Sequence, residues 1–371
     1  SNPVEATLAG IFTDVLDIDR VGADDGFFDL GGDSLTATQL VARVNATFDT
    51  DIGLQVVFET HTVAGLAGRI EQGDVVGATR PVLIAGPRPT RVPVSPAQQR
   101  MWYVNQLDTS SPAYNIPMVV RLVGAVDVAA LREAIGDVLE RHEALRTMFP
   151  DSEDGPTQVV VPVQDAMPDL TPIPVPGPAA LRERITWVVS GGFDVTRAVP
   201  MRAGLFEVGD TEHVLAVVMH HILADGYSMT PLIRDMSRAY GSRACGQAPG
   251  WAPLAVQYVD YTLWQRELLG SEDDPQSVTS QQLDYWRSVL RGAPPVLALP
   301  VDRPRSAVRS ARGGQVVFSV DTPTHSALAG LACEHGATVF MVAHAAFAVL
   351  LARICSAEEV VVGTPVAGRG E

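Results

Sequence analysis

The sequence predicts a small four-helix bundle followed by a larger layered α/β domain. Three observations support this prediction. Residues 4–70 place apolar side chains at helical spacing, residues 73–93 are rich in Pro and Gly, and the remaining chain alternates strand-like and amphipathic helical segments. Helices interleaved with strands over such a length are typical of helices packed on a sheet. We therefore expect one domain at residues 1–72, a linker at 73–93 and a second domain at 94–371.

The composition narrows the class of protein. The chain has 371 residues, of which 46% are hydrophobic and 19% charged, as in an ordinary globular protein. A formal net charge of −16 argues against nucleic acid and anionic membranes as partners, because both select basic surfaces. Three scattered cysteines predict neither a disulfide framework nor a zinc site, and the polar start does not resemble a signal peptide. These features predict a cytoplasmic protein without a metal site.

Helical periodicity defines the first domain. A helix over residues 4–16 aligns five apolar side chains on one face: Val4, Leu8, Ile11, Phe12 and Val15. A loop rich in Asp and Gly follows, then a second helix from about Leu35 to Phe48. The segment "TVAGLAGRI" predicts a further helix that ends near Ile70. A bundle of this size lies near the lower limit for a domain that folds alone.

The linker contains an apolar patch, "PVLIAG", which we expect to lie against a neighbouring domain. Beyond it, five segments predict strands: residues 119–124, 157–163, 213–222, 315–320 and 360–366. The run at 337–354 is apolar enough for a membrane span. It is short for that role and contains His344, so it predicts a helix buried on all sides.

Two amphipathic helices flank the histidine-containing strand in the sequence. The first is capped by Asp127 and carries one stripe of side chains: Leu131, Ile135, Val138, Leu139 and His142. The second follows the strand, with Ser228 as its expected cap. It also has an apolar stripe: Leu232, Ile233, Met236 and Tyr240.

The segment "FFDLGGDSL" places a serine at the start of the second helix. By default Ser34 is only a helix cap. However, Gly31 and Gly32 remove side chains from its approach, Asp33 adds negative charge, and the two phenylalanines of the segment are expected to fix the loop against the bundle. A serine without a neighbouring base is a poor nucleophile. It is a good acceptor for a group that another enzyme installs.

Residues 4–72 resemble an acyl or peptidyl carrier protein, and "LGGDSL" is similar to the phosphopantetheine attachment motif of that family. The resemblance implies that a phosphopantetheinyl transferase attaches 4′-phosphopantetheine covalently to Ser34. It also implies that the resulting arm holds an acyl or aminoacyl thioester.

Adjacent histidines end the strand at 213–222. If residues 214–223 are extended, the two side chains point to opposite faces. His221 then shares a face with Leu215, Val217 and Met219, and His220 shares the other with Val214, Ala216 and Val218. Two such rings cannot bind one metal. One interpretation is that both are core residues with satisfied nitrogens.

The turn "ADG" favours a second interpretation, in which the histidines lie at the mouth of the sheet. A neutral imidazole there can take a proton from an amine, which is typically worth about 10²–10⁴ in rate. Asp225 then pairs with an arginine and keeps the turn rigid.

"HHILADG" matches the HHxxxDG signature of condensation domains in nonribosomal peptide synthetases and related chloramphenicol-acetyltransferase-like acyltransferases. Four more blocks match in the family's order: "SPAQQRMWYV" (95–104), "RHEALRTMF" (141–149), "YVDYTLWQREL" (258–268) and "VVGTPVAGR" (361–369). The resemblance implies a chloramphenicol-acetyltransferase-like layered fold, with His221 catalytic, His220 on the buried face, and Asp225 and Gly226 shaping the loop. It also makes two motif arginines candidate partners of Asp225, and the sequence does not choose between them: Arg146 and Arg369.

The implied reaction is amide bond formation. The amine of a downstream carrier-bound aminoacyl thioester attacks a donor thioester held at Ser34, while His221 orients or deprotonates the amine and donors near the turn stabilise the oxyanion. The implied partners are an upstream adenylation domain, a downstream peptidyl carrier domain and a phosphopantetheinyl transferase. Neither nucleic acid nor a membrane is expected.

The sequence departs from the family in length. Residues 94–371 are shorter than a complete condensation domain, with an N-terminal lobe to about residue 270 and an incomplete C-terminal lobe. Two alternatives remain open. One is a non-catalytic carrier or docking module with an inert scaffold, and the other is an acyltransferase that acts on a soluble amine or alcohol.

Overall fold

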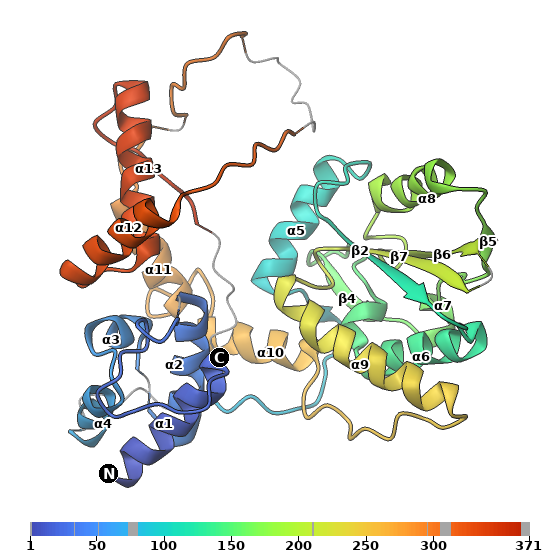
Figure 1. The fold of residues 1–371 in the computed structure, drawn as a ribbon, viewed down its shortest axis with the longest axis horizontal. Helices are drawn as coiled ribbons and strands as arrows, with labels where there is room; N and C mark the ends of the chain where they lie inside the picture. The colour runs from blue at the N-terminus through green and yellow to red at the C-terminus, as the bar shows by residue number, and fades with distance from the viewer. Residues whose placement is uncertain are drawn as a thin grey trace. The chain divides into compact units, whose positions relative to one another are not determined.

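The computed structural model describes the chain over these ranges: 2–32, 34–50, 52–72, 81–209, 211–294, 296–304 and 313–364. Its contacts divide the chain into two compact units. One unit contains Ser1–Arg80 and Tyr285–Glu371, and the other contains Pro81–Asp284. Figure 1 shows the elements of both, and each is described by itself.

The N-terminal bundle contains four helices: α1 (Pro3–Leu16), α2 (Ser34–Phe48), α3 (Leu54–Glu59) and α4 (Val63–Glu71). The predicted apolar face of α1 is confirmed, since Leu8 and Phe12 are fully buried among residues of the other helices. The side chain of Asn2 caps α1 and forms a capping box with Glu5. The predicted four-helix bundle is therefore present, and only α3 had no separate signal in the sequence.

The described half of the expected linker belongs to the second unit. Val92 and Pro93 form strand β1, and Arg88 pairs with Glu143 at 2.8 Å. The indole nitrogen of Trp264 donates a hydrogen bond to the carbonyl oxygen of Pro81. Val82 and Ile84 are about three-quarters exposed. The expectation that "PVLIAG" lies against a neighbouring domain stays a prediction.

The second unit is built on a four-stranded sheet of order β2-β7-β6-β5. Its strands are β2 (Asn115–Val123), β5 (Ile173–Pro174), β6 (Met201–Gly209) and β7 (Glu212–His220). β7 is central and antiparallel to both neighbours, with Asn115 opposite His220 and Met201 opposite Met219. Nine-residue β7 matches the predicted histidine strand except at its end.

Helices cover both faces of this sheet, as Figure 1 shows. On one face, α6 (Val128–Arg141) and α9 (Gly226–Ala244) pack against the odd-numbered residues of β7, including Leu215 and Val217. On the other face, α8 (Pro178–Ser190) packs against Val214, Ala216 and Val218. The predicted α/β layers and the alternation of β7 are therefore confirmed.

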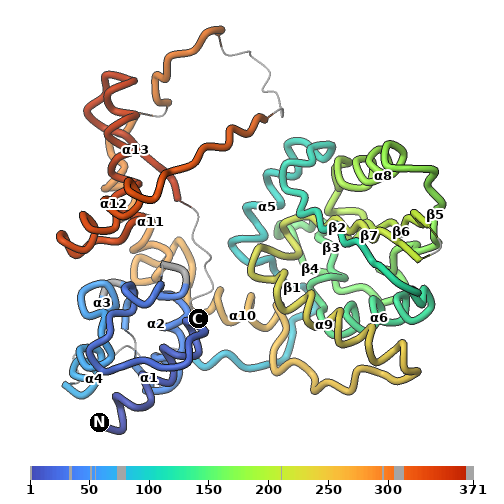
Figure 2. Tube along the Cα trace, viewed as in Figure 1, coloured from blue at the N-terminus to red at the C-terminus, as the bar shows by residue number. Residues whose placement is uncertain are grey.

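The remaining elements of the unit surround this core. They are α5 (Pro96–Leu107), the 3₁₀ helix η1 (Glu143–Arg146), β3 (Thr147–Met148), β4 (Thr157–Val160), α7 (Val163–Ala166), α10 (Tyr258–Leu269) and α11 (Val278–Val289), which runs past the end of the unit. β1, β4 and β3 form a second, three-stranded sheet, visible in Figure 2. The predicted strand at 157–163 is thus shorter than expected, because α7 begins at Val163.

The predicted caps of α6 and α9 have different outcomes. Asp127 caps α6 as expected, with its side chain accepting the Ala130 N–H at 2.9 Å. Ser228 does not cap α9. Asp225 does, because its carboxylate accepts the N–H of Ser228 at 3.0 Å while the Ser228 hydroxyl accepts the N–H of Asp225 at 3.1 Å. This reciprocal pair is a capping box, and it starts the helix at Gly226.

Two helices follow in the C-terminal part: α12 (Thr322–Glu334) and α13 (Val339–Cys355). The predicted strands at 315–320 and 360–366 are not formed within their described residues, and 365–366 lie outside them. Val316, Val317 and Phe318 are more than 80% exposed. A strand needs a partner for its backbone groups, and the described part of the chain provides none here.

The apolar run at 337–354 forms α13, but the expectation that it is buried on all sides is wrong. None of its described residues is buried, although α13 packs against α12. Within the described ranges, no single helix has the length and hydrophobicity to cross a membrane. α12 and α13 reach the criterion only when taken together, as a pair bent by 104°.

Candidate active site and carrier serine

β7 ends at His220, and the chain turns at His221. The N–H of His221 donates to the carbonyl oxygen of Tyr114 at 2.8 Å, and the N–H of Leu223 donates back to the carbonyl oxygen of His220 at 3.0 Å. The expectation that the strand continues to residue 223 is therefore wrong, because the second bond closes a turn. The His221 side chain is exposed to solvent, at the open end of the strand.

His220 has the opposite environment. Its side chain is buried, with its ring edge-on to Phe193 at 6.4 Å between centroids. Its Nδ1 accepts the N–H of Ile222 at 3.1 Å, which assigns the ring proton to Nε2. Burial lowers the pKa of His220 from 6.5 to about 4, and the charge of neighbouring His221 lowers it further in the same direction. His220 is therefore neutral at pH 7 and serves as a hydrogen-bond acceptor that holds the turn.

Arg202 contacts the aromatic ring on which the buried His220 packs. Its guanidinium lies 4.0 Å from the ring centroid of Phe193, the same ring that contacts His220. It also donates to three backbone carbonyls in the last turn of α8 and just after it: Val188, Gly191 and Gly192. Burial lowers the pKa of Arg202 from its usual value. A Cβ on Gly192 would lie 2.2 Å from the carbonyl oxygen of Thr109, so only glycine allows this close approach.

The turn after His221 leads directly into α9. Asp225 and Ser228 form the capping box described above, which fixes the first turn of a 19-residue helix. The N-terminal N–H groups of such a helix carry partial positive charge, and the helix begins five residues after the exposed His221 in the chain. Gly226 is exposed and has no atoms within 4 Å of an added Cβ, so nothing in the structure explains why this position is glycine.

The two candidate arginine partners of Asp225 have different outcomes. Arg146 donates to the carbonyl oxygens of Leu139 at 2.9 Å and Val161 at 2.7 Å, and its nearest carboxylate is Glu143 at 3.9 Å. Arg146 is therefore not the partner of Asp225. Its guanidinium donates its hydrogen bonds to backbone carbonyls at the end of α6 and after β4. Arg369 lies outside the described residues, so that pairing stays a prediction.

A buried ionic cluster near the site had no assigned role in the sequence. Asp235 of α9 accepts hydrogen bonds from Arg141 at 2.8 Å and from the Nε2 of His142 at 2.9 Å. Burial raises the pKa of Asp235, but the bonds from His142 and Arg141 outweigh it and lower the net value. Arg141 also lies 4.8 Å from the ring centroid of Trp251. In the sequence, the pair "RH" that opens the block at 141–149 was the signal that could have indicated this cluster. The cluster connects α9 to the end of α6.

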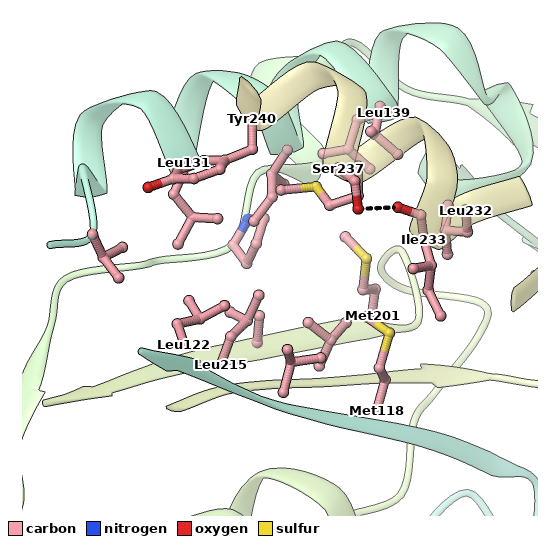
Figure 3. Close-up of a pocket in the computed structure, with 18 of the residues that line it drawn as sticks. Met118, Leu122, Leu131, Leu139, Met201, Leu215, Leu232, Ile233, Ser237 and Tyr240 are labelled. Carbon is pink, nitrogen blue, oxygen red and sulfur yellow. Dashed lines mark hydrogen bonds between the residues drawn. The ribbon is translucent and has the colours of Figure 1, made fainter. Parts of the chain in front are cut away.

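An apolar pocket of about 450 Å³ lies between the sheet and the helices α6 and α9, as Figure 3 shows. Met219 of β7 lines it, two residues before His221. The sequence contained its two walls, the alternating residues of β7 and the stripe on α9, but did not reveal that a space remains between them. Within the described residues, no three His, Cys, Asp or Glu side chains are grouped as a metal site would require.

Ser34, the predicted attachment serine, is the first residue of α2. Gly31 has φ = 97°, a left-handed conformation that favours glycine. A Cβ on Gly32 would lie 2.4 Å from the Phe27 ring, so glycine is needed there for a steric reason. Asp33 lies outside the described residues.

Both phenylalanines of the loop are anchored in the bundle, as the sequence predicts. Phe27 is fully buried and packs edge-to-face on Phe12 at 5.2 Å, and Phe28 stacks on Phe58 at 4.9 Å. An anchored loop without side chains at Gly31 and Gly32, followed by a helix N-terminus, suits the phosphate of a phosphopantetheine group.

Comparisons with known proteins agree with this geometry. The model of the phosphopantetheine attachment site matches residues 6–70, and the model of the condensation domain matches residues 89–371. A probable non-canonical nonribosomal peptide synthetase, CymA of Salinispora arenicola, is 45% identical over 99% of this chain. A dimodular nonribosomal peptide synthase of Bacillus subtilis is 40% identical over the whole chain. The chain spans only 5% and 15% of these two relatives.

Solved structures give the same result for the fold. The X-domain from teicoplanin biosynthesis, solved in complex with OxyB, is 38% identical with a TM-score of 0.69, over 75% of this chain and 60% of that one. A four-domain nonribosomal peptide synthetase bound to AMP and glycine is 27% identical with a TM-score of 0.63, over 76% of this chain and 21% of that one. The chain thus belongs to the condensation-domain family of nonribosomal peptide synthetases, with a phosphopantetheine-binding carrier domain in front of the condensation domain.

Proposed function

We propose that this chain forms an amide bond between a donor acyl or peptidyl group carried on its own Ser34 and the amine of an aminoacyl group on a downstream carrier. The observation that carries the proposal is the environment of His221. An exposed imidazole directly after β7, in the turn that leads into a long helix, is suited to act on a substrate amine.

Ser34 is the proposed attachment point of 4′-phosphopantetheine. When bound, the group supplies a thioester that is already activated for acyl transfer. The chain's own contribution is the presentation of the serine at the N-terminus of α2, behind Gly31 and Gly32. A phosphopantetheinyl transferase is then a necessary partner.

His221 is proposed to accept a proton from the attacking amine. The lone pair of the amine forms the new C–N bond at the donor carbonyl, the C–S bond breaks, and the leaving thiolate of the donor arm takes the proton back from His221 to become a thiol. His220 has a separate role, because a neutral His220 keeps the N–H of Ile222 bonded and holds the turn that presents His221. Proximity of two tethered reactants then supplies much of the rate.

The N-terminus of α9 is proposed to stabilise the negative charge that develops on the donor carbonyl oxygen. Its first-turn N–H groups begin at Gly226, five residues after His221, and the capping box fixes their direction. No metal is required for this mechanism, since the helix terminus and the imidazole provide the charge stabilisation and the base.

The proposed partners follow from the family. An upstream adenylation domain would load the carrier at Ser34, and a downstream peptidyl carrier domain would deliver the acceptor. The supporting fact is that the relatives are multidomain synthetases far longer than this chain. The proposed location is the cytoplasm, where such synthetases find coenzyme A and ATP.

The deciding experiment is a peptide-bond assay in a protein that extends this chain to the full length of its condensation-domain relatives. Ser34 is converted to the phosphopantetheine form and loaded with a donor, a loaded acceptor carrier is added, and the amide product is measured by mass spectrometry. We expect His221→Ala to lower the rate by about 10²–10⁴. Equal rates for both proteins would refute a catalytic role of His221.

Two controls separate the parts of the proposal. Ser34→Ala should abolish the mass increase of one phosphopantetheine group, and a modified Ser34→Ala protein would rule out this attachment point. Adding free amines and alcohols in excess tests the soluble-acceptor alternative. If they replace the carrier-bound acceptor at equal rate, the downstream carrier is not the true partner.

A docking module is the second candidate, and the similarity to the teicoplanin X-domain favours it. That domain was solved in complex with another protein, OxyB. A docking role predicts that His221→Ala leaves product formation unchanged, while changes on the domain surface weaken binding of a partner protein. The assay above therefore discriminates between the two functions.

A further inference from the structure

Asn115, the first residue of β2, lies beside the turn that presents His221 and has no part in the reaction described above. Its amide nitrogen donates hydrogen bonds to the carbonyl oxygens of Val189 at 2.8 Å and Gly191 at 2.9 Å. Val189 is in the last turn of α8, and Gly191 follows that helix. The side chain of Asn115 therefore connects the start of β2 to the end of α8.

The residue before Asn115 holds the backbone of His221. The carbonyl oxygen of Tyr114 accepts the N–H of His221 at 2.8 Å, and this bond continues the β2–β7 pairing by one residue. The peptide bond between Tyr114 and Asn115 includes this carbonyl group. A displacement of Asn115 therefore moves the acceptor that fixes His221.

Asn115 also faces His220 across the sheet. The two residues are directly opposite in the β2–β7 register, and opposite side chains lie on the same face of a sheet. The N–H of His220 donates to the carbonyl oxygen of Pro200 at 2.9 Å, on the β6 side. The pair with Asn115 is therefore the type without mutual backbone hydrogen bonds, in which side chains approach each other most closely.

The side-chain oxygen of Asn115 is buried and has no hydrogen-bond partner among the described residues. The carbonyls of Val189 and Gly191 fix the orientation of the amide, because exchanging its oxygen and nitrogen would place the oxygen against two other oxygens. A buried carbonyl oxygen without a donor costs stability, and most such groups in folded proteins are paired. Stability alone therefore does not account for an asparagine at this position.

The unpaired oxygen is placed to influence the tautomer of His220. Within the described sheet β2 is an edge strand, so a buried atom of Asn115 lies toward the interior, on the side of His220. The Nδ1 of His220 accepts the N–H of Ile222, so the ring proton is on Nε2. No hydrogen bond joins the rings and amide of these two described residues, but the partial negative charge of a carbonyl oxygen acts beyond hydrogen-bond distance in a buried site. The oxygen therefore favours the tautomer on which the turn depends.

We propose that Asn115 is a positioning residue for His221. Its amide nitrogen fixes the Tyr114 carbonyl that holds the His221 backbone, and its oxygen favours the His220 tautomer that closes the turn. Asn115 itself touches no reacting atom. The inference rests on the proposed function, because only that function gives His221 a substrate.

The first experiment measures both effects without catalysis, in the 371-residue protein. Hydrogen exchange of the His221 amide reports its bond to Tyr114, and long-range ¹H–¹⁵N spectra of histidine-labelled protein report the tautomer of His220, with His220→Asn used for assignment. Asn115→Leu has a similar size but neither donates nor accepts. We expect it to speed exchange of the His221 amide by about tenfold, the effect of losing one hydrogen bond, and to populate both tautomers. Unchanged exchange and an unchanged tautomer in the folded variant would overturn the proposal.

Asn115→Asp separates the two effects, because aspartate has the shape of asparagine but no amide hydrogens. The carbonyls of Val189 and Gly191 then lose their donor, whereas an oxygen still faces His220. At pH 8 we expect faster exchange of the His221 amide and an unchanged His220 tautomer. Loss of the Nε2–H tautomer would refute the role of the oxygen, and unchanged amide exchange would refute the role of the nitrogen.

The condensation assay connects these effects to the reaction. It uses the extended protein of the peptide-bond assay, with a donor loaded at Ser34. A misplacement of about 1 Å can cost about 10²-fold in rate, so we expect Asn115→Leu to lower kcat by about 10–100-fold with a similar KM for the acceptor. Gln158→Met is the matched control. Buried Gln158 also donates from its amide to a backbone carbonyl, that of Pro93 at 2.8 Å, but it lies in the other sheet, so this variant should keep its kcat.

The outcomes separate this inference from the proposed function. If the wild type condenses and Asn115→Leu has the same kcat, the positioning role is refuted and the proposed function stands. An equal loss of kcat in Asn115→Leu and Gln158→Met also refutes the positioning role, because the loss then reflects general destabilisation, which thermal melting of both variants measures. If amide exchange and tautomer change as expected but the wild type condenses no donor, the proposed function is refuted and the structural link from Asn115 to His221 stands.

Discussion

The buried, neutral state of His220 makes the stability of the condensation domain depend on pH in a defined way. In the folded protein the pKa of His220 is about 4, whereas an unfolded histidine titrates near 6.5. Above pH 6.5 neither state binds the proton, and the stability is complete. Between pH 6.5 and 4 only the unfolded state binds it, so the free energy of unfolding falls as the pH falls.

The size of this effect follows from the two pKa values. A tenfold change in a binding constant is worth about 1.4 kcal/mol, so the interval from 6.5 to about 4 corresponds to a loss of about 3 kcal/mol. The test is His220→Asn. Asparagine cannot titrate, but its Oδ1 is bonded to Cγ as the Nδ1 of histidine is, so it can still accept the N–H of Ile222.

Urea unfolding at pH 7, 6, 5 and 4 measures the free energies of both proteins. Tryptophan fluorescence reports the condensation domain selectively, because all five tryptophans lie beyond residue 72. Carboxylates that titrate in the same range cancel in the difference between wild type and variant. We expect the stability advantage of the wild type to shrink by about 3 kcal/mol from pH 7 to pH 4. A difference that stays constant over this range would refute the buried, neutral state of His220.

Three further predictions follow from the packing. Gly32→Ala should destabilise the carrier domain by about 1–3 kcal/mol, because the added Cβ clashes with Phe27. Gly10→Ala in α1 should stabilise the same domain by about 1 kcal/mol, because its added Cβ has no atom within 4 Å. Amide hydrogen exchange in α1 and α2 measures both changes. Asp235→Asn should cost about 3 kcal/mol in tryptophan-detected unfolding at pH 7, and the difference should shrink in acid as the carboxylate of the wild type is protonated. Arg202→Lys keeps the charge near Phe193 but loses the planar fork that serves three carbonyls, so steady-state condensation should show a lower kcat at similar KM; an unchanged kcat would exclude a positioning role.

The sequence predicted the elements whose periodicity is long and whose partners are local. The face of α1, the cap at Asp127 and the alternation of β7 each depend on spacing within one segment, and each is present in the structure. The cap of α9 was misassigned because Asp225 and Ser228 each have a side chain that can cap a helix. Only the reciprocal hydrogen bonds reveal which one lies outside the helix.

Predictions that depended on distant partners were less successful. Residues 315–320 have strong strand propensity, yet no described segment pairs with them, so propensity alone did not form a strand. Arg146 was a candidate partner for Asp225 because both are motif residues, but carbonyls near it in the chain and in space take its donors. The pocket could not be predicted, because the volume between two apolar walls depends on how the helices rest on the sheet.

The turn at residues 220–223 separates two functions that the sequence places side by side. A strand that continued one residue further would have put His221 on the same face as Met219, inside the aliphatic layer under α9, where a protonated ring would be strongly disfavoured. The bond from Ile222 N–H to the Nδ1 of His220 exists only while His220 is neutral, and it helps form the turn that keeps His221 exposed. Burial of the first histidine is therefore a condition for the availability of the second. Since Arg202 and Phe193 back the first ring, a change in that packing should reach His221 without touching any substrate atom.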